Sequence, residues 1–171
     1  MDMLNANRRE LLLMPLLATL PAVFVARSAE AAPDPSMTIV KPPPELTWVK
    51  AEGFPEKSVE QAPLWGRTAE AGLYYTLVRW HPGYMSAPHW YESDRYCVVV
   101  SGTWWVASGD KFDPENTVPA PAGTFVRRVA RTPHYDGVKK DGTEPAVIAI
   151  CGIGPIAFHN TEPRTPGWRK L

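Results

Sequence analysis

The sequence predicts an all-β domain, a sandwich or small barrel built from short strands. Its 19 prolines and 12 glycines argue against a helical bundle, because both residues are costly inside helices. About eight short apolar or β-branched segments recur at spacings of about ten residues, with turn residues between them, as in sandwiches and barrels. No segment after Ala32 shows a helical apolar period longer than two turns. A chain of 171 residues has room for one domain with a real core.

The charge balance excludes one large class of partners. Lys plus Arg and Asp plus Glu number 18 each, so no basic surface predicts binding to nucleic acid. The sequence has no dinucleotide-binding or phosphate-binding glycine motif, no HExxH and no CxxC.

The first 31 residues predict an export signal. Arg8 and Arg9 precede an uncharged apolar run over residues 11–26, and the A-x-A pattern of residues 29–31 follows it. The paired arginines resemble a bacterial twin-arginine signal. A membrane anchor is the alternative, but the apolar run contains two prolines and is shorter than the roughly 20 residues a spanning helix needs. We expect cleavage after residues 1–31, no stable membrane span afterwards, and a periplasmic or secreted bacterial protein.

The rest of the chain divides into three parts: a proline-rich extended arm at 32–45, a barrel at 46–156 and a polar tail at 157–171. Turn residues between apolar segments predict two hairpins, one joining 95–100 to 103–108 and one in which KKDGTEP leads into 146–155. The stretch from Gly53 to Gly66 has little periodicity and is expected to be a loop. Strands are predicted at 46–50, 73–80, 95–100, 103–108, 125–130 and 146–155.

The run from Gly83 to Gly102 resembles the first motif of the cupins, which are small β-barrels of the jelly-roll type. That motif reads G-x5-H-x-H-x3,4-E-x6-G. Here His89 occupies the first histidine position, Tyr91 the second and Arg95 the position of the glutamate. The resemblance therefore keeps the spacing and loses two of the usual ligands.

The second cupin motif, G-x5-P-x-G-x2-H-x3-N, is matched by spacing from Gly123 onward. The leading glycine and His134 are kept, whereas the proline and the second glycine are replaced and Val138 stands in place of the asparagine. The resemblance covers about Leu46 to Pro155. It implies a cupin-type jelly-roll barrel, a single domain with an extended N-terminal arm.

Cupin metal sites use imidazole and carboxylate ligands that point into the barrel. The resemblance implies that His89 and Tyr91, on one strand face because side chains alternate, hold a metal together with His134 from a facing strand. Imidazole ligands suit a divalent transition metal such as Fe, Mn, Ni, Cu or Zn. The alternatives are ordinary buried histidines and, for Tyr91, a hydrogen-bonding wall of the pocket.

Arg95 cannot ligate a metal, because a guanidinium group is always charged and has no lone pair to offer. One interpretation is that Arg95 points into the barrel and binds an anionic group of the substrate, a carboxylate being the natural bidentate partner. The other is that it pairs with Asp94 or Glu92 at the barrel mouth.

Two further pairs of residues alternate along predicted strands. Trp104 and Trp105 must point to opposite faces, and we expect Trp104 to line the pocket and contact the substrate, with plain packing as the alternative. Arg127 and Arg128 alternate in the same way, so one of them can face the cavity.

Cys97 and Cys151 are the two cysteines of the chain. Export would place them in an oxidising compartment, and the resemblance places their strands side by side in one sheet. They are therefore a disulfide candidate, provided that Cys151 faces inward as Cys97 does. Buried free thiols are the alternative.

Two functions remain open on the sequence alone. The first is a metal-dependent enzyme that acts on a small anionic molecule by an oxidation, isomerisation or lyase step. The second is a non-catalytic small-molecule binding or sensing cupin with a degenerate metal site. Whether the protein is an enzyme is left open, and a homodimer that pairs through Met37–Lys50 is expected.

Overall fold

The computed structural model describes residue 36 and residues 38–171. The chain divides into two units, and the second, Pro44–Leu171, holds every strand of the described residues. The export signal predicted at 1–31 lies outside the described residues, as do residues 32–35 and 37 of the arm predicted at 32–45, so both stay predictions. The described part of the chain has no helix that is long and apolar enough to span a bilayer.

The all-β prediction is confirmed. Within the described residues the one helical element is a short 3-10 turn, η1 (Pro43–Glu45). The strands are β1 (Val49–Lys50), β2 (Val59–Trp65), β3 (Gly72–Trp80), β4 (Tyr84–Ser86), β5 (His89–Trp90), β6 (Arg95–Ser101), β7 (Thr103–Ser108), β8 (Val118–Pro121), β9 (Phe125–Arg128), β10 (His134–Val138), β11 (Ala146–Gly154), β12 (His159–Asn160) and β13 (Trp168–Lys170).

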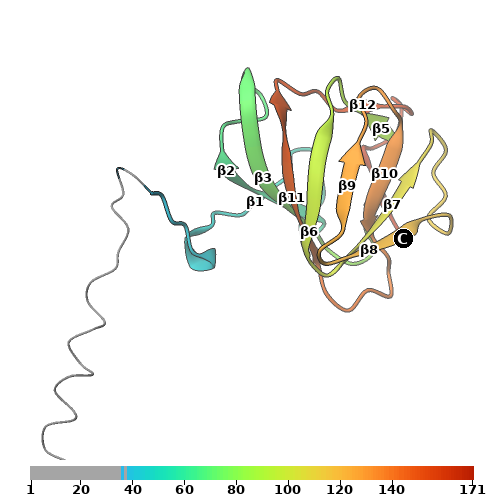
Figure 1. The fold of residues 1–171 in the computed structure, drawn as a ribbon. Coiled ribbons are helices and arrows are strands. Elements are labelled where there is room, and N and C mark those ends of the chain that lie inside the picture. The colour runs from blue at the N-terminus through green and yellow to red at the C-terminus, as the bar shows by residue number, and fades with distance from the viewer. Residues whose placement is uncertain (1–35, 37) are drawn as a thin grey trace, which may run out of the picture. The chain divides into compact units, whose positions relative to one another are not determined.

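Two antiparallel sheets make up the jelly-roll barrel (Figure 1). The first sheet has the order β1-β2-β3-β11-β6-β9. The second has the order β12-β5-β10-β4-β13, with β7 paired to β10 and β8 paired to β7. The site strands β5 and β10 thus lie in the second sheet, and β6, which carries Arg95, lies in the first.

The core lies between the inner faces of the two sheets. Strand β3 shows how the sequence builds it, because Tyr74, Thr76, Val78 and Trp80 are buried at every second position. The first sheet further contributes Cys97, Val99, Ile148 and Ile150 to the core, and the second contributes Trp104, Ala120 and Val138. This apolar layer surrounds the polar side chains of the site.

Both predicted hairpins are wrong. Strands β6 and β7 lie in different sheets, and so do β10 and β11. Gly102, between β6 and β7, has φ +71°, and a Cβ there would lie 2.5 Å from the carbonyl oxygen of Pro145. Turn residues between two apolar segments predict a change of direction, but only tertiary packing decides whether the next strand pairs or crosses to the other sheet.

Two further segments differ from expectation. The loop expected at Gly53–Gly66 contains β2, which pairs with β3 through a register shift between Pro63 and Trp65. That irregularity breaks the alternation that would have predicted a strand. The segment predicted as a tail supplies β12 and β13, which pair with β5 and β4 in the second sheet.

The disulfide candidate is not formed, and both cysteines are free. Their strands are neighbours as expected, but Cys97 lies opposite Ile150 and Cys151 lies opposite Tyr96. A difference of one register position puts the two thiols on opposite faces of the sheet. Cys97 faces the core and is 1% exposed.

Substituting Gly102 by alanine should destabilise the fold by roughly 2 kcal/mol or more, because left-handed strain and a backbone clash add together. Gly53→Ala is the matched control, since Gly53 has φ +77° and open space around its missing Cβ. Urea unfolding measures both. Equal losses in the two variants would contradict the account of Gly102.

Candidate functional site

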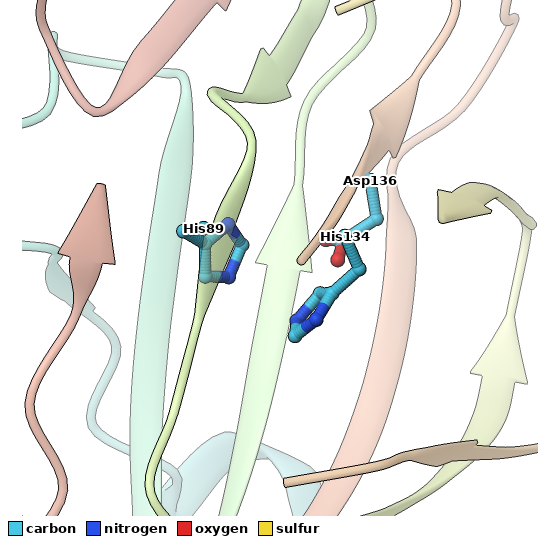
Figure 2. A group of neighbouring side chains, drawn as sticks. All are labelled: His89, His134 and Asp136. Atoms are coloured by element: carbon cyan, nitrogen blue, oxygen red, sulfur yellow. The ribbon is translucent and has the colours of Figure 1, made fainter. Parts of the chain in front are cut away.

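Three potential metal ligands come together on the inner face of the second sheet. His89 in β5 and His134 in β10 lie directly opposite each other on adjacent antiparallel strands, and their ring centroids are 4.5 Å apart. Asp136 follows two positions after His134, so it lies on the same face. One donor atom from each of the three lies within 4.8 Å of the others (Figure 2). The histidines are therefore brought together as predicted, but from neighbouring rather than facing strands.

Backbone carbonyl groups orient both imidazole rings. Nδ1 of His89 lies 2.8 Å from the carbonyl oxygen of Ala87, and Nδ1 of His134 lies 2.9 Å from that of Thr132. A carbonyl oxygen only accepts, so each Nδ1 carries the proton and donates it. Nε2 of each ring is then left with its lone pair, and Nε2 of His134 is buried without a hydrogen-bond partner.

The rings are held in the neutral form that binds metals. Burial lowers the pKa of His89 to about 3, with the charge of His134 adding to the effect. Burial also lowers the pKa of His134 to about 4, reinforced by the Arg128 guanidinium. At neutral pH both Nε2 atoms can therefore donate a lone pair without first losing a proton.

Sequence reasoning missed Asp136. The residue is 6% exposed, and its carboxylate accepts two hydrogen bonds, from Arg128 Nη2 at 2.9 Å and from Trp104 Nε1 at 3.1 Å. Burial is the largest single influence and raises the pKa of this carboxyl group. The positive charge of Arg128 and the smaller contributions of the two histidines and Arg95 together leave the pKa below its ordinary value. The signal was present in the sequence, because His134-Tyr135-Asp136 places two potential ligands on one strand face.

Arg95 points into the barrel. Its guanidinium lies over the ring of Tyr91, 4.3 Å from the centroid, and its Nε is buried without a hydrogen-bond partner. In the register of the first sheet Arg95 lies opposite Arg128, so two guanidinium groups enter the chamber from adjacent strands. This is the position that the first interpretation of Arg95 requires.

The alternative interpretation of Arg95, an ion pair at the mouth, is wrong. Asp94 instead forms an ion pair with Arg127, and it also accepts a hydrogen bond from the backbone of Ala130. Glu92 pairs with His159. Because Asp94 and Arg127 face outward together, the alternation of Arg127 with Arg128 is resolved in favour of Arg128 inside.

Tyr91 and Trp104 both line the chamber, but their contacts favour supporting roles. Burial raises the pKa of the Tyr91 phenol, which favours a protonated wall over a phenolate ligand. The role of Tyr91 as a metal ligand therefore stays a prediction, and its burial counts against that role. As expected, Trp104 lies inside and Trp105 lies outside, where the Lys139 ammonium sits over its ring. The Trp104 indole N–H binds Asp136, so this side chain positions a candidate ligand.

The site has two compartments. An inner chamber of about 60 Å³ is lined by His89, Asp136, Arg95, Arg128, Tyr91 and Gln61, among others. An outer groove of about 520 Å³ is lined by Phe54, Val59, Ile156, Phe158, Glu52 and Asn160, among others, and also by Gln61 and Tyr91. Because Gln61 and Tyr91 line both spaces, these two side chains lie at the boundary between them, here called the neck.

The residues present fit a divalent transition metal. Two oriented neutral imidazoles and one carboxylate are the donor set found at open sites for such ions, and the orphaned Nε2 of His134 lacks only an acceptor of its lone pair. The guanidinium groups of Arg95 and Arg128 outnumber the single carboxylate of Asp136. An anion should therefore accompany a metal in this chamber.

The buried histidines make stability depend on pH. Both titrate near pH 6.5 when the chain is unfolded but at about 3 and about 4 when it is folded. As the pH falls below 6.5 the unfolded chain takes up protons that the folded chain does not. The free energy of unfolding of metal-free protein should then drop, by up to about 1.4 kcal/mol per pH unit for each histidine.

The measurement is urea unfolding of metal-free protein between pH 7.5 and pH 4. The double variant His89→Asn/His134→Asn should lose most of the pH dependence in that window, and each single variant should lose part of it. An unchanged slope in the double variant would show that other groups are responsible.

No protein-family model matches this chain, and no curated protein matches it. Solved structures do match. The polyketide cyclase RemF from Streptomyces resistomycificus is 13% identical with TM-score 0.60, over 72% of this chain and 85% of that one. An RmlC-like cupin from Ralstonia eutropha JMP134 is 14% identical with TM-score 0.57, over 78% of this chain and 79% of that one.

A cupin-2 domain from Rhodospirillum rubrum is 14% identical with TM-score 0.50, over 68% of this chain and 74% of that one. Structural similarity at such low sequence identity establishes the fold alone, and the chemistry must be argued from the site itself. The matched structures agree with the two antiparallel sheets and the inward-facing histidines. The chain therefore has the cupin fold.

Proposed function

We propose that this protein is a metal-dependent enzyme that acts on a small anionic organic molecule between the two sheets. The observation that carries the proposal is the cluster of His89, His134 and Asp136, whose donor atoms lie within 4.8 Å of one another. Both rings are neutral and oriented by the backbone before any ion arrives. Such preorganisation is what a metal site requires of its ligands.

His89, His134 and Asp136 would hold a divalent transition metal such as Fe, Mn, Ni, Cu or Zn. When bound, the metal would supply Lewis acidity toward a substrate oxygen and open coordination positions. Arg95 would bind the anionic group of the substrate, and the aromatic ring of Tyr91 would hold the guanidinium in place. Trp104 and Arg128 would fix Asp136 in position.

The reaction class is an oxidation, isomerisation or lyase step, and the chamber supports it by excluding bulk water. Ile148, Ile150 and Val78 line the chamber beside the polar groups. In such surroundings a fixed charge acts more strongly than it would in water. RemF, which is named a polyketide cyclase, illustrates that the same fold can carry an enzyme.

A metal-free ligand-binding module is the second candidate, and one observation favours it. Both oxygens of Asp136 already accept hydrogen bonds from Arg128 and Trp104. A carboxylate neutralised in this way attracts a cation less, and Arg95 adds a further positive charge. The chamber would then hold an anion alone and bind it without turnover.

Export and dimer formation belong to the proposal as well. Cleavage after residues 1–31 would place the domain in the periplasm or outside the cell of a bacterium. Pairing through Met37–Lys50 would give a homodimer. Small molecules, rather than nucleic acids, are the proposed partners in either case.

The metal content of the purified protein tests the enzyme proposal. We expect near-stoichiometric metal in the wild type and its loss in each of His89→Ala and His134→Ala, because each variant removes one of the three ligands. Asp136→Asn should lower metal affinity by at least about 10-fold to 100-fold, the loss expected when even an outer-shell partner of a ligand is removed. Elemental analysis by mass spectrometry measures each.

His81→Ala is the matched control, since His81 lies outside the chamber and pairs with Glu60. It should keep the wild-type metal content. A wild-type protein that takes up none of the five metals at pH 7.5 would overturn the enzyme proposal and leave the metal-free module.

A further inference from the structure

We propose that the ligand of this site is a monocarboxylic acid with an apolar body that contains a ring. Its carboxylate would lie at Arg95 in the inner chamber and its body in the outer groove. The inference rests on the proposed function of the chamber as a small-molecule site and names its substrate class. It follows from the charges, the sizes and the linings of the two compartments.

Arg95 is the cation available to a ligand. Arg128 is committed, because its guanidinium donates to Asp136 at 2.9 Å and to the carbonyl oxygen of Ala107 at 3.2 Å. The Nε atoms of both arginines are buried without a hydrogen-bond partner. Arg95 differs because it takes part in none of the ion pairs found among the described residues. A carboxylate presents two oxygens to a guanidinium group and matches this vacancy in both charge and geometry.

The sizes of the compartments dictate a ligand in two parts. The chamber of about 60 Å³ is about fivefold smaller than the roughly 300 Å³ at which ligand-binding pockets begin. It accepts a carboxylate group and excludes a whole organic acid. The groove of about 520 Å³ falls within the range of ligand-binding pockets, about 300–1,000 Å³.

The neck fixes how the two parts join. Gln61 and Tyr91 line both compartments, so the ligand must pass between an amide and a phenol ring. The first bonds beyond the carboxylate would therefore be narrow and unbranched. The bulk of the ligand begins outside the neck.

The groove selects an apolar ring. Phe54, Phe158, Val59 and Ile156 line it. The Phe158 ring already stacks on His89, with centroids 4.3 Å apart and an angle of 18° between the rings. Aromatic walls of this kind favour a flat apolar partner in offset or edge contact.

The negative charge of Glu52 is the reason why the proposed ligand has only one carboxylate. Among the described residues that line the groove it is the one charged side chain. A second carboxylate on the body of the ligand would be repelled by Glu52 and would have no cation to compensate it. A diacid is therefore disfavoured relative to a monoacid of the same shape.

Calorimetric titration of the full-length protein tests the proposal, in a chelator-treated sample and in a metal-loaded one. The probes are hydrocinnamate, its uncharged amide, acetate and the para-carboxy derivative of hydrocinnamate. Hydrocinnamate should bind at least about tenfold more tightly than each of the other three. The amide loses a charged hydrogen bond to Arg95, acetate lacks the apolar body that fills the groove, and the para-carboxy derivative is repelled by Glu52.

Variants separate the parts of the site. Arg95→Met should weaken hydrocinnamate by about tenfold or more and leave binding of the amide unchanged. Arg127→Met, the outward-facing neighbour, is the matched control and should bind like the wild type. Phe158→Ala should weaken hydrocinnamate but not acetate. Glu52→Gln should bring the para-carboxy derivative close to hydrocinnamate.

Each outcome decides one proposal. Arg95-dependent carboxylate binding in both samples supports the inference. If the protein also takes up no metal, the inference stands and the enzyme proposal fails. A metal-loaded protein that does not distinguish hydrocinnamate from its amide overturns the inference and leaves the metal site standing. Failure of hydrocinnamate to bind at about 10 mM also overturns it. The comparison of hydrocinnamate with its amide uses wild-type protein, so it decides even if Arg95→Met fails to fold.

Discussion

The buried ion pair between Arg128 and Asp136 is the interaction on which the rest of the site depends. It joins β9 of the first sheet to β10 of the second across the barrel interior, at 2.9 Å, and Trp104 from β7 completes it. Removing one member of such a pair leaves an uncompensated buried charge, which costs several kcal/mol. The pair therefore fixes the spacing of the two sheets at the point where the histidines lie.

The same pair decides which charges remain for a ligand. With Arg128 directed to Asp136, the positive charge of Arg95 has no carboxylate partner among the described residues. A cupin that keeps a glutamate at this position would present a negative charge here, and this chain presents a positive one. The inner chamber thereby combines ligands for a cation with a binding group for an anion. This combination suits a metal and a substrate carboxylate bound together better than it suits either of them alone.

Burial of the histidines and the small chamber volume have one cause. The apolar inner faces of both sheets close around the polar groups, and this closure keeps His89 and His134 neutral. It also limits what can enter beyond Gln61 and Tyr91. The outer groove, built partly from the residues that follow β11, supplies the room that the chamber lacks.

The sequence by itself determined the all-β class, the two cupin-like motifs and the candidate positions His89, His134 and Arg95, because turn residues, strand periodicity and motif spacing are local properties. Tertiary structure alone decided which strands pair. Both predicted hairpins failed for that reason, and one register position separated Cys97 from Cys151. It also decided that Asp136 joins the histidines, since a carboxylate becomes a candidate ligand only when folding brings its oxygens within reach of their nitrogens.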